Sequence, residues 1–180
     1  MNMAHRIVSV VLCFAAFSCL AATVVLKETG SAMIKPQPAW INSNVNGSTS
    51  VTLTPVNPDG YCTAGIILWK FDLSAYMGWA ITNDADMTCA QNWGEPGPHR
   101  FRAFAILSNW TETAVTWANW IGGNTGAGDL YFTNWFGPEI AFADVTYVNA
   151  DTLTHWYIPA AVVESWLDGS SPYKGIAIIP

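Results

Sequence analysis

The chain has 180 residues, of which 51% are hydrophobic and 11% are charged, and its formal net charge at pH 7 is −6. This length corresponds to about one domain. The sequence has no basic patch, which makes nucleic acid and anionic membrane surfaces poor candidates as partners. Ten tryptophans among few charged residues predict a well-filled aromatic core.

The N-terminus has the pattern of an export signal. Arg6 precedes an apolar run, and the small residues Cys19 and Ala21 suit a signal-peptidase site. We predict that residues 1–21 are removed, leaving a single secreted or cell-surface domain, residues 22–180. Lipid attachment at Cys19 is the alternative. The apolar run is shorter than the roughly 20 residues that a membrane span needs.

Two cysteines remain after this cleavage, Cys62 and Cys89. In an exported chain such a pair predicts one disulfide, worth about 3–4 kcal/mol for a loop of this length. Two buried free thiols are the alternative. Neither cysteine has a partner at ligand spacing, so a metal site is not expected.

The first half of the mature chain reads as short strands separated by loops. Thr23–Lys27 is rich in β-branched residues and predicts a first strand, with Ser31–Ile34 as a second piece. Val51–Pro55 alternates like a strand. Gly65–Ser74 is a nearly continuous apolar run, which fits a strand covered on both faces.

The second half continues this pattern. Residues Ile81 to Cys89 alternate with a period of two, which predicts a strand with one wet side. Further strands are predicted at Phe101–Leu107, Asp129–Trp135, Ile140–Phe142, Val145–Val148, Leu153–Ile158 and Gly175–Pro180. Pro159 suits the first turn of a short helix, Ala160–Leu167. We therefore expect an all-β, jelly-roll-type antiparallel sandwich with one short helix near the C-terminus.

The stretch Asn109–Trp120 holds three tryptophans in twelve residues and follows a predicted strand. It predicts a packed corner between strands, in which the tryptophans supply a large apolar mass. The Glu112 carboxylate in this stretch is expected to accept backbone N–H bonds.

Several motifs stand in a recognisable order along the chain. They are the opening Ala22–Leu26 segment, then Lys70–Ser74, then the corner pattern Trp110-x-Glu112-x-x-Val115-Thr116-Trp117-x-Asn119, and finally Trp166–Gly169 followed by Tyr173–Ile176. This order resembles the DNRLRE domain family, which overlaps carbohydrate-binding module family 96. The resemblance implies a secreted jelly roll attached to larger extracellular proteins, with polysaccharide binding in some members.

The same resemblance implies structural roles for the motif residues, which are Trp110, Glu112, Thr116, Trp117 and Trp166. It also implies at least one further strand after the Gly175–Ile176 stretch, so either the chain continues beyond Pro180 or the sheet lacks a final strand and an edge is left open.

The inventory of reactive side chains predicts a non-catalytic module. His99 and His155 lie in no nucleophile or metal motif. A glycan-active enzyme that pairs Glu112 with Glu139 or Asp144 is the weaker alternative, because glycosidases need two facing carboxylates.

Three aspartates are candidate oxygen ligands for Ca²⁺, namely Asp84, Asp86 and Asp129. No spaced calcium-loop pattern accompanies them. A solvated acidic face is therefore the favoured interpretation, and no cofactor is expected.

The candidate binding residues are tryptophans in or beside loops rich in Gly and Asn. A sugar ring packs its C–H face on an indole and bonds its hydroxyls to nearby amides. We expect Trp93, Trp120 and Trp135, with Asn119 and Asn124, to form a surface that binds a polysaccharide or a cell-surface glycan.

The second hypothesis is a structural or adhesive subunit that forms a homo-polymer or joins a larger extracellular assembly. An open sheet edge presents unpaired backbone groups and accepts an added strand. Gly175–Pro180 or Thr23–Lys27 is the expected donor or acceptor.

Overall fold

The computed structural model describes residues 23–35, 42, 44–46, 65–90, 98–120, 135–146, 148 and 152–180. The predicted signal, residues 1–21, lies outside these ranges. So do Val51–Pro55 and residues 129–134 of two predicted strands.

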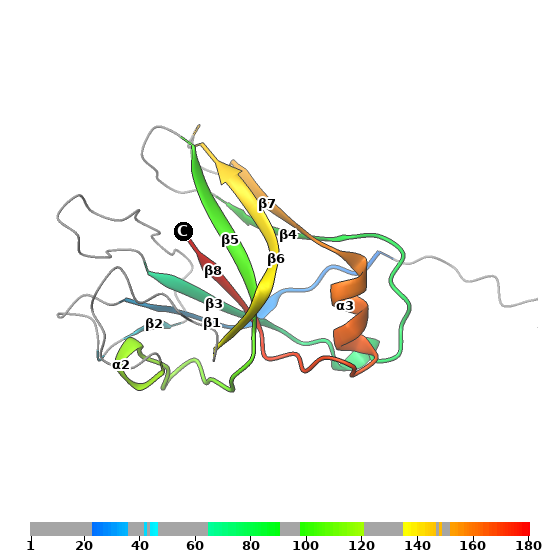
Figure 1. Ribbon diagram of the computed structural model, residues 1–180, viewed down its shortest axis with the longest axis horizontal. Coiled ribbons are helices and arrows are strands. Elements are labelled where there is room, and N and C mark those ends of the chain that lie inside the picture. The colour runs from blue at the N-terminus through cyan, green and yellow to red at the C-terminus, as the bar shows by residue number, and fades with distance from the viewer. Residues whose placement is uncertain are drawn as a thin grey trace, which may run out of the picture.

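The larger sheet is antiparallel and has the strand order β2-β1-β3-β8-β5-β6. Its strands are β1 (Glu28–Ile34), β2 (Asn44–Asn46), β3 (Ile66–Phe71), β5 (His99–Ile106), β6 (Phe136–Val145) and β8 (Ile176–Ile179). The strands at the two ends of this sheet run in clearly different directions (Figure 1), as the natural twist of a wide sheet requires.

A second sheet pairs β4 (Ala85–Ala90) with β7 (Leu153–Ile158) in an unbroken antiparallel register. Helix α3 (Ala160–Leu167) follows β7 directly. Two shorter helical turns are η1 (Ser74–Tyr76) and α2 (Trp117–Trp120). The prediction of an all-β fold with two antiparallel sheets and a short helix at 160–167 is confirmed, whereas the jelly-roll connection order stays a prediction. No helix among the described residues is long and apolar enough to cross a bilayer.

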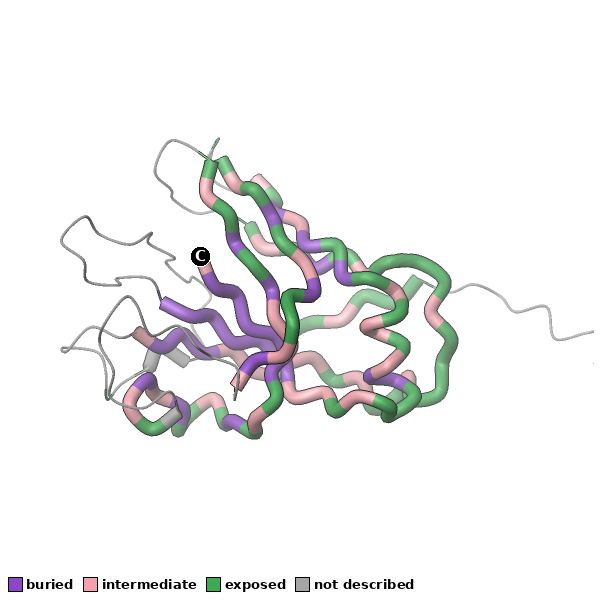
Figure 2. Tube along the Cα trace, in the orientation of Figure 1, coloured by how far each residue is buried: buried purple, intermediate pink, exposed green. Residues whose placement is uncertain are grey.

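The core has two parts, one on each face of the larger sheet. On one face, Trp69 and Ile178 pack with Trp156 of β7 and Trp166 of α3. On the other face, the stretch Asn109–Trp120, which we call the tryptophan corner, covers Leu68 and other buried side chains. Both faces of β3 and β8 are therefore covered, which explains their continuous apolar sequences (Figure 2).

Several predicted element boundaries are wrong, because tertiary partners decide them. Residues 23–27 are not a strand: β1 begins at Glu28, where pairing with Phe71 of β3 starts. The strand predicted from Ile81 begins at Ala85, where pairing with β7 starts. The piece predicted at Ile140–Phe142 lies within the longer strand β6, which ends at Val145, the first residue of the piece predicted at Val145–Val148. The corner contains the turn α2 rather than only a loop.

The expected open edge at Gly175–Pro180 is also wrong. Strand β8 lies between β3 and β5, so that Ile178 pairs with Ile67 on one side and Ala103 on the other. Gly175 leads into β8 with a φ of 121°, and a Cβ at this position would lie 2.5 Å from the Trp69 carbonyl oxygen. Only glycine fits this entry to the middle of the sheet.

Candidate functional site

The tryptophan corner is held by bonds to distant strands. The Trp110 indole N–H donates to the Lys174 carbonyl oxygen at 2.9 Å, and the Lys70 ammonium donates to the Trp110 carbonyl oxygen at 2.6 Å. The Glu112 carboxylate accepts the Ser31 N–H at 3.3 Å. These contacts tie β1, β3 and the approach to β8 to one corner.

The turn α2 begins with a reciprocal pair of bonds between Thr116 and Asn119. The Thr116 N–H donates to Asn119 Oδ1 at 2.8 Å, and the Asn119 N–H donates to Thr116 Oγ1 at 3.2 Å. Asn119 Nδ2 also donates to the Ala114 carbonyl oxygen at 2.6 Å. Asn119 thus stabilises the turn, and its predicted contact with a glycan stays a prediction.

The tryptophans divide between the core and the surface. Trp110, Trp117 and Trp166 are buried in the core. Trp135 is half-buried and packs against the core beneath the corner. Trp93, Asn124 and the side chain of Trp120 lie outside the described residues, so the predicted loop platform stays a prediction.

Cys89 carries a free thiol on β4, and burial raises the pKa of this thiol, with a further contribution from Glu28. Its expected partner Cys62 lies outside the described residues. The disulfide is therefore not supported by the structure and stays a prediction.

The acidic and histidine candidates have structural partners. Asp84 Oδ1 accepts the Ala160 N–H at 2.9 Å at the start of α3, and the Asp86 carboxylate contacts His155 Nδ1 at 2.9 Å. Asp129 lies outside the described residues. Within the described ranges, no three side chains of the metal-binding types gather in one place. One imidazole nitrogen of His99, Nε2, is buried and makes no hydrogen bond to another described group.

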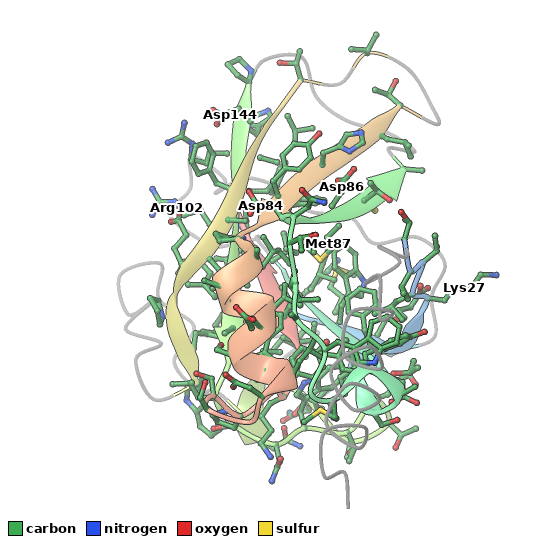
Figure 3. All side chains as sticks on the ribbon, turned by 90° about the vertical axis from the view of Figure 1, so that its right-hand side faces the viewer. Lys27, Asp84, Asp86, Met87, Arg102 and Asp144 are labelled. Carbon is green, nitrogen blue, oxygen red and sulfur yellow. The ribbon has the colours of Figure 1, made fainter. Side chains whose placement is uncertain are left out.

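The carboxylates considered for catalysis point to separate partners. The Asp144 carboxylate forms a two-bond pair with Arg100 at 2.7 Å, and Glu139 lies 3.6 Å from Arg102. Glu112 binds the backbone of β1 instead. Figure 3 shows Arg102 and Asp144 projecting from the outer side of the molecule.

Two adjoining hollows form a groove beside the end of β3. We call it the Asp72 groove, because Asp72, Phe71 and Tyr173 line both hollows. One hollow has a volume of about 300 Å³, and the other has a volume of about 420 Å³. The first is completed by Thr29, Lys70 and Lys174. The second is completed by Leu73, Ser74, Met77, Trp166, Gly169, Ser171 and Pro172.

The two ends of the Asp72 groove differ in chemistry. Lys70 and Lys174 give one end positive charge, and the pKa of Lys70 is lowered by burial and by Lys174. Asp72 lines both hollows, and hydrogen bonds from Ser74 lower its pKa below the ordinary value. Among the described residues, the other end has no further charged side chain and is lined by a mixture of apolar residues such as Met77 and Trp166 and small polar residues such as Ser74 and Ser171.

Tyr173 is the rigid wall of the Asp72 groove. Its hydroxyl oxygen accepts the Phe71 N–H at 3.0 Å, and its ring lies 5.0 Å from the Trp166 ring. Burial raises the pKa of Tyr173 to about 12, so the phenol is neutral at physiological pH. A neutral phenol offers both a hydrogen-bond donor and an apolar ring face to a ligand.

The turn η1 presents aromatic surface next to the groove. Met77 lines the groove, and Trp79 two residues later is 46% exposed and packs edge-on against Tyr76. The Gly78 N–H donates to the Leu167 carbonyl oxygen at 2.8 Å, which fixes this turn against the end of α3. Trp79 is thus a solvent-exposed indole on a fixed support.

Sequence patterns did not point to this groove. Its residues come from the start of β1, the end of β3, η1 and the segment after α3, and no two of these segments are neighbours in sequence except β3 and η1. The available signal was an unusual aromatic segment, Tyr76–Trp79, directly after an apolar strand.

Comparisons of the chain with protein-family models and with curated proteins find no match. The resemblance to the DNRLRE domain family therefore rests on the motifs of the chain alone.

Proposed function

We propose that this chain is a secreted, non-catalytic module of jelly-roll type that binds polysaccharide in the Asp72 groove. The observation that carries the proposal is the composition of this groove, in which aromatic walls surround a charged carboxylate and two ammonium groups. The exposed Trp79 indole lies on the same turn as Met77 at the groove wall.

A sugar chain fits such a surface because each ring has an apolar C–H face and a rim of hydroxyls. Phe71 and Tyr173 supply apolar ring surface within the groove, and Asp72 and Lys174 supply an acceptor and a donor for hydroxyls. Trp79 lies outside the groove lining and offers an exposed indole two residues after Met77. The chemistry agrees with what the motif resemblance implies, although the residues differ from the loop tryptophans predicted from sequence.

The composition of the groove favours binding over hydrolysis. Asp72 is the one carboxylate among the described residues that line the groove, whereas retaining and inverting glycosidases use two. Hydrogen bonds with Ser74 lower the pKa of Asp72 below its ordinary value, whereas a general acid needs a raised pKa.

Retention on insoluble polysaccharides and titration with soluble ones test this proposal. We expect Trp79→Ala and Lys174→Ala each to weaken binding about fivefold or more, because truncation of a contact residue commonly costs more than about 1 kcal/mol. Tyr157→Ala is the matched control, since Tyr157 is 60% exposed on β7 and does not line the groove.

Trp135→Ala separates the groove from the loop platform. Loss of binding in Trp135→Ala, with Trp79→Ala unchanged and both variants folded, would place the site at the loops. Absence of retention on a broad set of neutral and acidic polysaccharides would refute the proposed function.

A further inference from the structure

We propose that residues 23–27 of one copy add as an antiparallel strand to the outer edge of β4 in a second copy. This edge is a different surface from the Asp72 groove. The experiment that tests it measures the oligomeric state of the chain and not glycan binding.

The donor segment has the sequence of a strand but is not one in the single chain. Thr23-Val24-Val25-Leu26-Lys27 is rich in β-branched residues, which favour strands, yet it forms no ladder with the described residues. Val25 is 86% exposed and Val24 is 39% exposed. An added strand gives Val24 cover on the apolar side of the sheet, and it gives Val25 a cross-strand neighbour on the outward side.

The acceptor is the edge of the two-stranded sheet. Within the described residues, β4 pairs along its full length with β7 and has no partner on its other side. An added strand satisfies the backbone groups of this edge that take part in no ladder. The shortness of this sheet makes β4 a better acceptor than β6, which carries Pro138 and pairs with a wide sheet.

The alternation of the two segments sets the register. On β4, Met87 and Cys89 face the core while Asp86, Thr88 and Ala90 face outward. A donor strand that places Val24 and Leu26 inward continues the apolar side. Its outward side then consists of Thr23, Val25 and Lys27.

Charge selects the direction of the added strand. With Val25 opposite Thr88, an antiparallel donor brings Lys27 opposite Asp86, whereas a parallel donor brings Lys27 opposite Ala90. Asp86 and the nearby Asp84 give the start of β4 negative charge. Figure 3 shows Lys27 extending away from the molecule on the side that carries β4. Antiparallel pairing is therefore the arrangement that joins opposite charges.

A contact of this kind joins two different surfaces of the chain. Such a head-to-tail contact produces a ladder of species unless two copies exchange their segments reciprocally. Light scattering coupled to size exclusion, applied to the secreted chain over a wide concentration range, is expected to show species larger than a monomer. Val25→Pro removes a backbone donor from the added strand and is expected to return the chain to a monomer.

Val148→Lys serves as the control for a change at an exposed valine outside both segments. Val148 is 68% exposed and distant in sequence from both segments, and this variant is expected to assemble normally. A chain that stays monomeric at the highest concentration overturns the proposal, as does assembly that survives Val25→Pro.

A charge exchange tests the partner and the direction together. Lys27→Glu and Asp86→Lys are each expected to weaken assembly about threefold to tenfold, and the double variant is expected to recover it. Circular dichroism and thermal melting confirm that each variant folds. Single variants without effect, or a double variant weaker than both, would exclude the β4 edge as the acceptor.

Discussion

Glu112 fixes the middle of β1, because its carboxylate accepts the Ser31 N–H at 3.3 Å although 81 residues separate the two. Gly30, the neighbour of Ser31, lies at a register shift between β1 and β3. At this shift the backbone of β1 receives a side-chain acceptor from the tryptophan corner.

This contact predicts a structural role for Glu112. Glu112→Ala is expected to lower the free energy of unfolding by about 1–2 kcal/mol, because a partly buried bond to a charged group is lost. Glu112→Gln keeps an acceptor oxygen and is expected to lose less. Urea denaturation measures both variants, and an unchanged stability in Glu112→Ala would contradict the role.

Gly175→Ala is expected to be among the most damaging single substitutions in the described residues. A Cβ here meets the Trp69 carbonyl oxygen at 2.5 Å, and φ is 121°, so steric overlap adds to backbone strain. We expect a loss of about 3 kcal/mol or more, or failure to fold. Gly169→Ala is the control: its φ is 78° but its Cβ meets open space, so about 1 kcal/mol is expected. Equal melting temperatures for the two variants would be inconsistent with this account.

The raised pKa of Tyr173 predicts that the protein loses stability at alkaline pH. The phenol ionises near pH 10.0 in the unfolded chain and near pH 12 in the folded chain, because burial raises its pKa. The folded-state pKa is the higher one, so this stabilising contribution is complete below pH 10 and is lost as the pH rises from 10 to 12. The loss amounts to roughly 2–3 kcal/mol.

Tyr173→Phe isolates this effect, since phenylalanine does not ionise. The variant loses the bond to the Phe71 N–H and is expected to be about 1 kcal/mol less stable than the natural chain at pH 8. Above pH 12 the order is expected to reverse. Denaturation curves at several pH values test this, and a constant difference between the two proteins would argue against it.

The position of Asp84 predicts that its carboxylate stabilises the start of helix α3 and does not bind Ca²⁺. Its carboxylate accepts the Ala160 N–H at the start of α3, where Pro159 supplies no side-chain cap. Asp84→Ala is expected to lower stability by about 1 kcal/mol. Added Ca²⁺ is expected to leave the melting temperature unchanged, whereas a rise that disappears in Asp84→Ala would revive the calcium interpretation.

Local sequence was sufficient where one pattern decides the structure. The proline before α3 locates that helix, and the apolar run of β3 indicates cover on both faces. It was insufficient where a distant partner decides. Residues 23–27 have strand-forming side chains, but the ladder with β3 begins only at Glu28.

The candidate site was less predictable than the fold. Polar neighbours in sequence favour the loop tryptophans as binding residues, yet Trp135 packs against the core. The Asp72 groove exists only because β3, η1 and the segment after α3 converge around Tyr173. No periodicity or spacing encodes such a convergence, because it depends on the packing of α3 and on the path of the chain into β8.

The central place of β8 has a consequence for how the chain becomes folded. Synthesis delivers residues 176–179 after all the other described strands, yet these residues join β3 to β5. Until they arrive, the larger sheet exists as two halves with apolar edges, and the closing contacts span a long sequence distance. Folding should therefore be slow and late in synthesis.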